Sequence, residues 1–411
     1  MTTSAPNEVL ITGIGLISSL GEGIGPHLDE LDNPAARPRI DSDIYAPYSV
    51  HPLAAIDMSR QIAKKSDLKQ MEPWQRIGVY AAGLALEDAG IARDPVQLAQ
   101  THLVVAAGSG ERDTTVDAKV LEAIAARGDT DVLAKEILPT ALRPTLFLAQ
   151  LSNLLAGNIS IVHSVTASSR TFMGEEMAGL SAIENAVRRI AAGQAEMVLV
   201  GGALNAERED LLLGYELGCN LWAHPVVPVA DRRAAGGGFV PGSAGAFLVL
   251  ESRAHAEARG ARAYARIDEV VTDRARRSRD EDIRNTLAAL LDRAAVGVCG
   301  IPQAVLSGAC GVEPATSQEM EFLDRLGASS QSMPVRVYGD RFGHTVEAHF
   351  PLGVALAALA LERGRLFAPT AGGGGQEKVD VPLQCALVTG VGHWRGEGLA
   401  LMSRVGEEKR S

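Results

Sequence analysis

Short apolar runs that end in glycine recur along the chain and constrain its fold more than any other feature. The runs are Glu8–Gly15, His102–Gly110, Glu196–Gly202, Ala304–Gly311 and Ala386–Gly392. Because polar residues do not alternate with the apolar ones, each run predicts a strand that is buried on both faces of a sheet. The glycines at their ends allow the chain to turn sharply off each strand.

Alanine-rich segments with helical spacing lie between these runs. They are Trp74–Gly90, Gly179–Gly193 and Leu352–Gly364, and each stops at a glycine. The segments have little polar face, so they predict helices that pack between other layers. Strands that alternate with such helices indicate an α/β fold. A second series of strands and helices begins near residue 260, so we expect two halves, 1–260 and 261–411, that share one core.

Charge and cysteine content exclude several classes of function. The chain has 39 basic and 50 acidic side chains and a net charge of −11, which disfavours nucleic acids and anionic membrane surfaces as partners. Neither a membrane-spanning run nor a secretory signal is expected. The four cysteines have no metal-ligand or C-x-x-C spacing, so we expect no metal, no cofactor and four unpaired thiols in the cytoplasm.

Several segments in a fixed order resemble one family. They include Val9–Gly15, the GFVPGSAG turn at Gly238–Gly245 and the strand Leu248–Glu251. The chain resembles the β-ketoacyl-acyl-carrier-protein synthases of the KAS II type, which are condensing enzymes of the thiolase fold, over nearly its whole length. The resemblance implies a layered αβαβα fold built from two similar halves with mixed sheets. It also implies an acyl carrier protein and a second synthase subunit as partners, the latter either another copy of this chain or an active synthase.

The family's nucleophile is a cysteine at the N-terminus of a buried helix, where the helix dipole favours a thiolate. The resemblance places Glu176 at this position, and no cysteine lies between residues 1 and 218. The surrounding segment is also similar to chain-length factors, the non-condensing partners in polyketide synthase heterodimers, which have glutamine there. The alternative is that Glu175 and Glu176 simply form an acidic first helical turn.

Other catalytic positions of the family are also changed. Cys310 stands at the first histidine, Gly339 at the lysine, and only the second histidine is retained, as His344. Cys310 is either a displaced nucleophile or, more commonly for such a residue, a small buried apolar side chain. His349 is interpreted as a helix residue without an assigned role.

The loop that contributes to the family's oxyanion hole reads Gly390-Val391-Gly392-His393 in this chain. The resemblance places Val391 at the phenylalanine that gates acyl entry, and His393 at a glycine. Changes at so many positions around one reaction centre predict the loss of condensation, since such residues act as a unit.

The leading hypothesis is therefore a non-condensing subunit of fatty acid or polyketide biosynthesis that pairs with an active synthase. The alternatives are residual decarboxylation of malonyl-carrier protein and a scaffold that binds acyl chains or carrier protein. Acyl carrier proteins are acidic and bind basic surfaces. The candidate residues for such a surface are Arg188, Arg189, Arg232 and Arg233.

Overall fold

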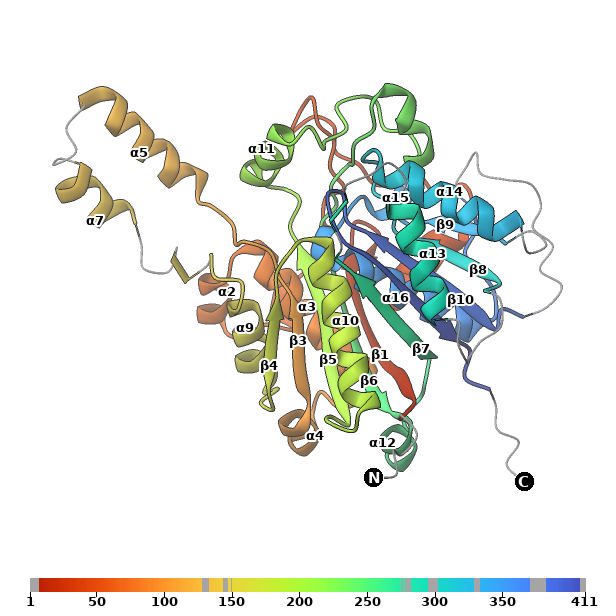
Figure 1. Ribbon diagram of the computed structural model, residues 1–411. Helices are drawn as coiled ribbons and strands as arrows, with labels where there is room; N and C mark the ends of the chain where they lie inside the picture. The colour runs from red at the N-terminus through yellow and green to blue at the C-terminus, as the bar shows by residue number, and fades with distance from the viewer. Residues whose placement is uncertain are drawn as a thin grey trace.

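The protein is described from a computed structural model, shown in Figure 1. The described residues are 7–127, 133–142, 147–148, 150–274, 276–277, 282–294, 302–328, 333–369 and 382–406. Cys299 and a glycine run at 371–375, for which a flexible turn is predicted, lie outside them.

The strands form one mixed sheet in which the same strand order occurs twice. The path runs β4-β3-β5-β6-β1-β7-β11-β10-β8-β9, with the short β2 (Gly21–Glu22) beside β1. The strands of each half can be numbered one to five along the chain, leaving out β2. From β1 or β7 outward, each half then has the order one, five, four, two, three. The strands of the first half are β1 (Val9–Ser18), β3 (His102–Ala106), β4 (Ser169–Phe172), β5 (Met197–Leu204) and β6 (Ala244–Ser252). Those of the second are β7 (Ala265–Asp273), β8 (Ala304–Ser307), β9 (Val335–Val337), β10 (Cys385–Val391) and β11 (Glu397–Ser403).

Helices cover both faces of each half and produce five layers. The middle layer is α10 (Glu176–Ala191) and α16 (His349–Arg363), the outer layer of the first half is α3 (Pro73–Asp88) and α9 (Leu154–His163), and that of the second is α13 (Asp282–Ala294) and α14 (Ala315–Ala328). Side chains alternate between these layers along a strand, as the pleat requires. Val104 of β3 packs into the cluster with α10 and α16, whereas Leu103 and Val105 pack into the cluster with α3. The thiolase-like αβαβα arrangement is thus confirmed.

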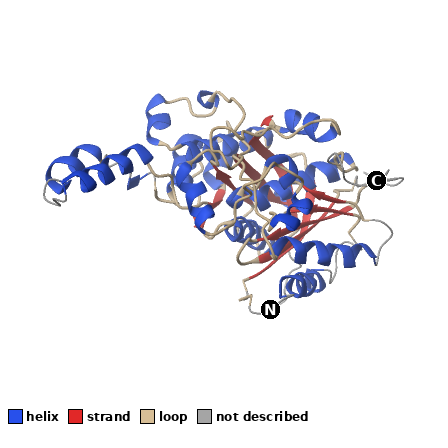
Figure 2. Ribbon diagram, turned by 90° about the horizontal axis from the view of Figure 1, so that it is seen from above, coloured by secondary structure: helices blue, strands red, loops and turns tan. Residues whose placement is uncertain are grey.

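Smaller elements lie around this core. Figure 1 shows α5 (Thr114–Arg127) and α7 (Leu138–Ala141) projecting from the body beyond β4, and Figure 2 shows the same projection from above. The remaining elements used below are α4 (Pro95–Gln100), α11 (Glu209–Leu217), α12 (Arg253–Ala258) and α15 (Gly339–Phe342). The boundary near residue 260, which falls between α12 and β7, stays a prediction.

Two expectations concern the environment of the protein. Among the described residues, no helix has the length and apolarity needed to span a bilayer. The expectation of four unpaired cysteines is wrong, because Cys385 is disulfide-bonded, whereas Cys219 and Cys310 are free. Sparse cysteines with no recognisable spacing concealed this bond, because a disulfide depends on the distance between two side chains in the fold. The cytoplasmic assignment stays a prediction and loses this part of its support.

Candidate functional site

Glu176 lies at the first turn of α10, in the buried centre of the molecule. The chain leaves β4 at Phe172 and enters the helix through Glu175, whose φ of 56° is in the left-handed region. A β-carbon at Gly179 would lie 2.6 Å from the main-chain oxygen of Glu347, so glycine allows α10 to pack closely against the segment before α16. As a result the Glu176 side chain is directed inward and the residue is only 3% exposed.

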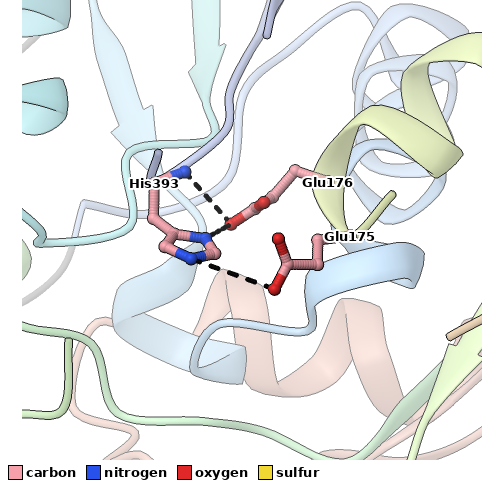
Figure 3. Close-up of side chains that lie close together, drawn as sticks. All are labelled: Glu175, Glu176 and His393. Atoms are coloured by element: carbon pink, nitrogen blue, oxygen red, sulfur yellow. Dashed lines mark hydrogen bonds and ion pairs between the residues drawn. The ribbon is translucent and has the colours of Figure 1, made fainter. Parts of the chain in front are cut away.

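Two histidines from distant parts of the sequence hold the Glu176 carboxylate. The Nε2 of His344 lies 2.7 Å from Oε1 of Glu176, and the Nδ1 of His393 lies 2.9 Å from the same oxygen. The main-chain N–H of His393 also donates to it over 3.3 Å. Figure 3 shows the His393 ring between Glu176 and Glu175, with its Nε2 3.9 Å from a Glu175 oxygen. One carboxylate oxygen is therefore shared by two imidazole rings.

The pKa values of this cluster follow from burial opposed by ion pairing. Burial alone would raise the pKa of Glu176, but the His393 charge and the hydrogen bonds from both histidines outweigh it and hold the pKa well below its ordinary value. Burial would lower the pKa of His393, yet the neighbouring Glu176 carboxylate raises it overall. The two shifts both favour an ionised glutamate paired with a protonated histidine.

Aromatic rings fix the orientation of the two histidines. Phe239 lies 4.8 Å from the His344 ring and 6.0 Å from the His393 ring, measured between centroids. His349, at the start of α16, packs against His344 at 4.4 Å, and its Nε2 lies 3.2 Å from the main-chain oxygen of Gly308. Burial and the nearby His344 lower the pKa of His349 well below its ordinary value, so it is a neutral supporting residue.

Cys310 and Gly339 supply no reactive group beside this cluster. Cys310 is 3% exposed, and burial together with the Glu176 charge raises the pKa of its thiol to about 12. A thiol with that pKa is a poor nucleophile, so the structure favours the apolar interpretation of Cys310. Gly339 begins α15, and a β-carbon there would lie 3.9 Å from the His349 ring.

The loop after β10 closes the site from the side of the second half. Gly392 is tightly enclosed, because a β-carbon there would lie 2.0 Å from the Arg395 main-chain oxygen and 3.4 Å from a Glu176 oxygen. Gly390 is enclosed as well, because a β-carbon there would collide with the side chains of Phe350 and Leu180. Val391 instead packs in the outer cluster with α13 and α14, so the structure does not place it with Glu176.

A cavity of about 730 Å³ lies next to the histidine–glutamate cluster. His393 and Glu175 form part of its wall, together with residues that the sequence did not single out: Trp74, Gly108, Arg208, Tyr215 and Glu347. Glu347 lies three residues after His344, and this proximity is its only signal in the sequence. The others have no sequence signal, because they come together only in the tertiary structure.

The described residues also include one set with the geometry of a cation site. Ligand atoms of Glu175, Glu176 and His393 all lie within 4.8 Å of one another. In the present arrangement Glu176 and His393 are hydrogen-bonded to each other, so a metal ion would have to displace the proton between them.

One of the proposed surface arginines is in fact internal. Arg232 is 2% exposed and donates to the main-chain oxygens of Val227 and Gly238, so its assignment to a basic surface patch is wrong. Its position in a short helical turn before a glycine-rich loop gave no indication of this burial. Arg188 is exposed and pairs with Glu184 on α10.

Known proteins resemble this chain in sequence and in fold. The profile of the β-ketoacyl synthase N-terminal domain matches residues 21–256. A 3-oxoacyl-[acyl-carrier-protein] synthase 2 of Vibrio harveyi is 26% identical over 267 residues, which cover 63% of this chain and 61% of that protein. A polyketide β-ketoacyl synthase 2 of Streptomyces coelicolor is 26% identical over 389 residues, covering 89% of this chain and 88% of that protein.

Solved structures show the same architecture. The ishigamide ketosynthase/chain length factor has a TM-score of 0.77 at 22% identity, covering 98% of this chain and all of that one. A β-ketoacyl synthase from Burkholderia phymatum has a TM-score of 0.78 at 19% identity, covering 97% of this chain and 100% of that chain. At these identities the likeness concerns the fold. Together with the sequence profile, which spans more than half of the residues, it leads to one conclusion: the chain belongs to the β-ketoacyl synthase family.

Proposed function

We propose that this protein is a non-condensing subunit that pairs with a catalytically complete β-ketoacyl synthase and shapes or assists its reaction. The observation that carries the proposal is the Glu176 carboxylate, which lies at the buried start of α10 where the family's reaction needs a thiolate. A carboxylate ion-paired to an imidazolium is a poor acyl carrier. Cys310, buried and with a raised pKa, offers no substitute.

The same geometry argues against residual decarboxylation of malonyl-carrier protein. That reaction needs hydrogen-bond donors aimed at the forming enolate. His344 and His393 instead direct their ring nitrogens at Glu176, over 2.7 and 2.9 Å. Since the Glu176 carboxylate already accepts hydrogen bonds from these two rings, an enolate would have to compete with it for the same donors.

A surface suited to a second subunit lies at one edge of the first half. β4 is the terminal strand of the sheet, so one side of its backbone has no strand partner among the described residues. Apolar side chains are exposed on the projecting α5 and after β4, including Leu121 at 65% and Met173 at 62%. Exposed apolar residues beside an open strand edge favour burial against another chain. The relatives include a ketosynthase/chain length factor and a ketosynthase in complex with an acyl carrier protein, which supports the choice of a synthase and a carrier protein as partners.

The test combines the purified protein with candidate synthases and with malonyl- and acyl-carrier protein, and follows carbon dioxide release and chain extension. The protein alone should give no extension and no carbon dioxide above background, but should co-purify with one synthase and alter its yield or product length. Turnover by the protein alone would contradict the proposal, as would failure to pair with any synthase encoded near it.

A matched pair of variants tests the surface. Leu121→Lys on α5 should weaken co-purification, whereas Val96→Lys on α4 introduces the same charge at a position that is 63% exposed in another part of the molecule and should not. Equal effects of the two substitutions would exclude the α5 face as the interface.

A further inference from the structure

Glu347 is a buried carboxyl group without a full set of partners, and it faces the 730 Å³ cavity. The residue lies in the helical turn Val346–Ala348 and is 4% exposed. Its Oε2 atom has no hydrogen-bond partner among the described residues. Gly108 packs directly against this carboxyl group, since a β-carbon at Gly108 would lie 2.5 Å from Oε1 of Glu347. Leaving a buried carboxylate oxygen unsatisfied is costly, so its position needs an explanation.

A second carboxylate faces the same cavity, and its hydrogen-bond partners are neutral. Glu175 accepts hydrogen bonds from the Tyr215 hydroxyl over 3.2 Å and from the Trp394 ring nitrogen. The ring of His393 lies 3.9 Å away, but it is hydrogen-bonded to Glu176. In the part of the chain that the structure describes, Glu175 and Glu347 therefore contribute negative charge to the wall without a hydrogen-bonded arginine or lysine.

The arginines of the cavity are occupied elsewhere. Arg208 donates from Nε to Asp210 over 2.8 Å, and its Nη2 contacts both Asp210 and the Gly110 main-chain oxygen. Arg112 forms a two-point ion pair with Asp117, at 2.6 and 2.8 Å. Because these cations are neutralised, the free charge of the cavity is negative and lies around Glu347 and Glu175.

We propose that the cavity binds a small organic molecule carrying a protonated amine, with its ammonium group held between Glu347 and Glu175. An ammonium group would supply the hydrogen-bond donor that Oε2 of Glu347 lacks. The volume is that of a small-molecule pocket, and Trp74, Leu204 and Leu211 offer apolar contact for a carbon skeleton. A bare metal ion would leave most of this space unfilled. The proposal concerns the chain by itself, and Met173 of the proposed pairing surface also lines the cavity.

Proton release should accompany binding. Burial, with the charges of Glu175 and Glu176 adding to it, raises the pKa of Glu347 to about 7, and a hydrogen bond with the main chain of Glu347 itself and the charge of Arg208 oppose this rise. The other titratable groups of the wall are Tyr215, His393, Asp210 and Arg112. An ammonium group next to Glu347 stabilises its ionised form, so at pH 7 about half a proton should leave for each amine bound.

Isothermal titration calorimetry of the purified full-length protein tests this proposal, with hexylammonium chloride, 1-hexanol, sodium hexanoate and zinc chloride as separate probes. Hexylammonium should bind at least 10-fold more tightly than hexanol or hexanoate. Its heat of binding should differ between two buffers of different ionisation enthalpy, which reports the released proton. Glu347→Gln should weaken hexylammonium binding roughly 10- to 100-fold and remove the proton release. Glu209→Gln, at an exposed position on α11, should change neither.

Three results would overturn the proposal. Equal affinity for hexanol and hexylammonium would indicate a neutral polar ligand. Tight binding of zinc without any binding of the amine would assign the site to a metal ion at Glu175, Glu176 and His393. Unchanged amine binding by a folded Glu347→Gln protein, verified by its thermal unfolding, would show that the amine binds elsewhere.

Discussion

Replacement of Glu176 by glutamine removes one charge from the buried cluster while nearly preserving its shape. In the wild type, one carboxylate oxygen receives contacts from His344 at 2.7 Å and from the His393 ring at 2.9 Å. A hydrogen bond to a charged acceptor stabilises a protein by roughly 1 kcal/mol more than a neutral one. Glu176→Gln should therefore lower the free energy of unfolding by about 2 kcal/mol.

The pH dependence of this loss gives the sharper test. Because the pKa of His393 is raised in the folded protein, its contribution to stability is fully present below pH 6.5, the ordinary pKa of histidine. That contribution is lost as the pH rises through the folded-state pKa. The lowered pKa of Glu176 means that its contribution is present above 4.5 and is lost as the pH falls through the folded-state value. The difference between wild type and variant should thus be largest between those two ordinary values and should shrink at alkaline pH.

Thermal unfolding followed by circular dichroism, at intervals from about pH 5 to pH 9, measures both effects. With an unfolding entropy of roughly 2 cal/mol/K per residue, a loss of about 2 kcal/mol in a chain of this length corresponds to a decrease in Tm of about 2 °C. The control is Glu257→Gln, which breaks an exposed pair with Arg253 at 3.3 Å and should cost less than about 0.5 kcal/mol. Equal decreases for both variants, or a Glu176→Gln effect that stays constant to high pH, would refute the ion-paired description of the cluster.

Three further predictions concern single positions. Glu176→Cys should not restore chain extension in the presence of acyl- and malonyl-carrier protein, because the resemblance places Cys310 and Gly339 at the family's first histidine and lysine; extension above background would contradict this. Iodoacetamide in excess should label the exposed Cys219 in the native protein but label Cys310 only after unfolding, as peptide mass spectrometry can determine; equal labelling would show that Cys310 is accessible. Gly15→Ala places a β-carbon 2.0 Å from a main-chain oxygen of α3 and should lower the unfolding free energy by about 2 kcal/mol or more. Gly214→Ala is the matched control on α11, where the added β-carbon would have none of the described atoms outside its own helical turn within 4 Å. It should leave the unfolding free energy unchanged or raise it by up to about 1 kcal/mol, as chemical denaturation can measure.

The strands and central helices were accessible from sequence because burial on both faces leaves a local trace. The runs around Val9, Leu103 and Val198 are mostly apolar, and each forms a strand within a few residues of the predicted bounds. Apolar spacing alone placed the start of α10 at Gly179, whereas the helix begins at Glu176, where the family resemblance had placed its N-terminus. The spacing misses this turn because it begins with a charged residue whose burial depends on contacts with His344 and His393.

The burial of isolated charged residues was not accessible in this way. Arg232 looks like a surface residue in sequence, but hydrogen bonds from its short helical turn to the main chain on either side hold it buried. Cys385 looks like a free thiol for the same reason, because nothing near it in sequence reveals its disulfide. The partners of Arg232 are only five and six residues away, so what the sequence pattern lacks is the folded path of the chain around them.

The sequence by itself determined the layered α/β fold and the family, because apolar runs and short motifs can be read one segment at a time. Only the tertiary structure decided how Glu176, His344 and His393 act on one another. It brings ring nitrogens of His344 and His393, from separate segments, to within 3 Å of one carboxylate oxygen of Glu176 and so forms an ion-paired cluster. It also directs Glu347 into a cavity whose walls come from both halves of the chain. Hydrogen bonding and charge depend on distances in space, and the order of residues does not contain those distances.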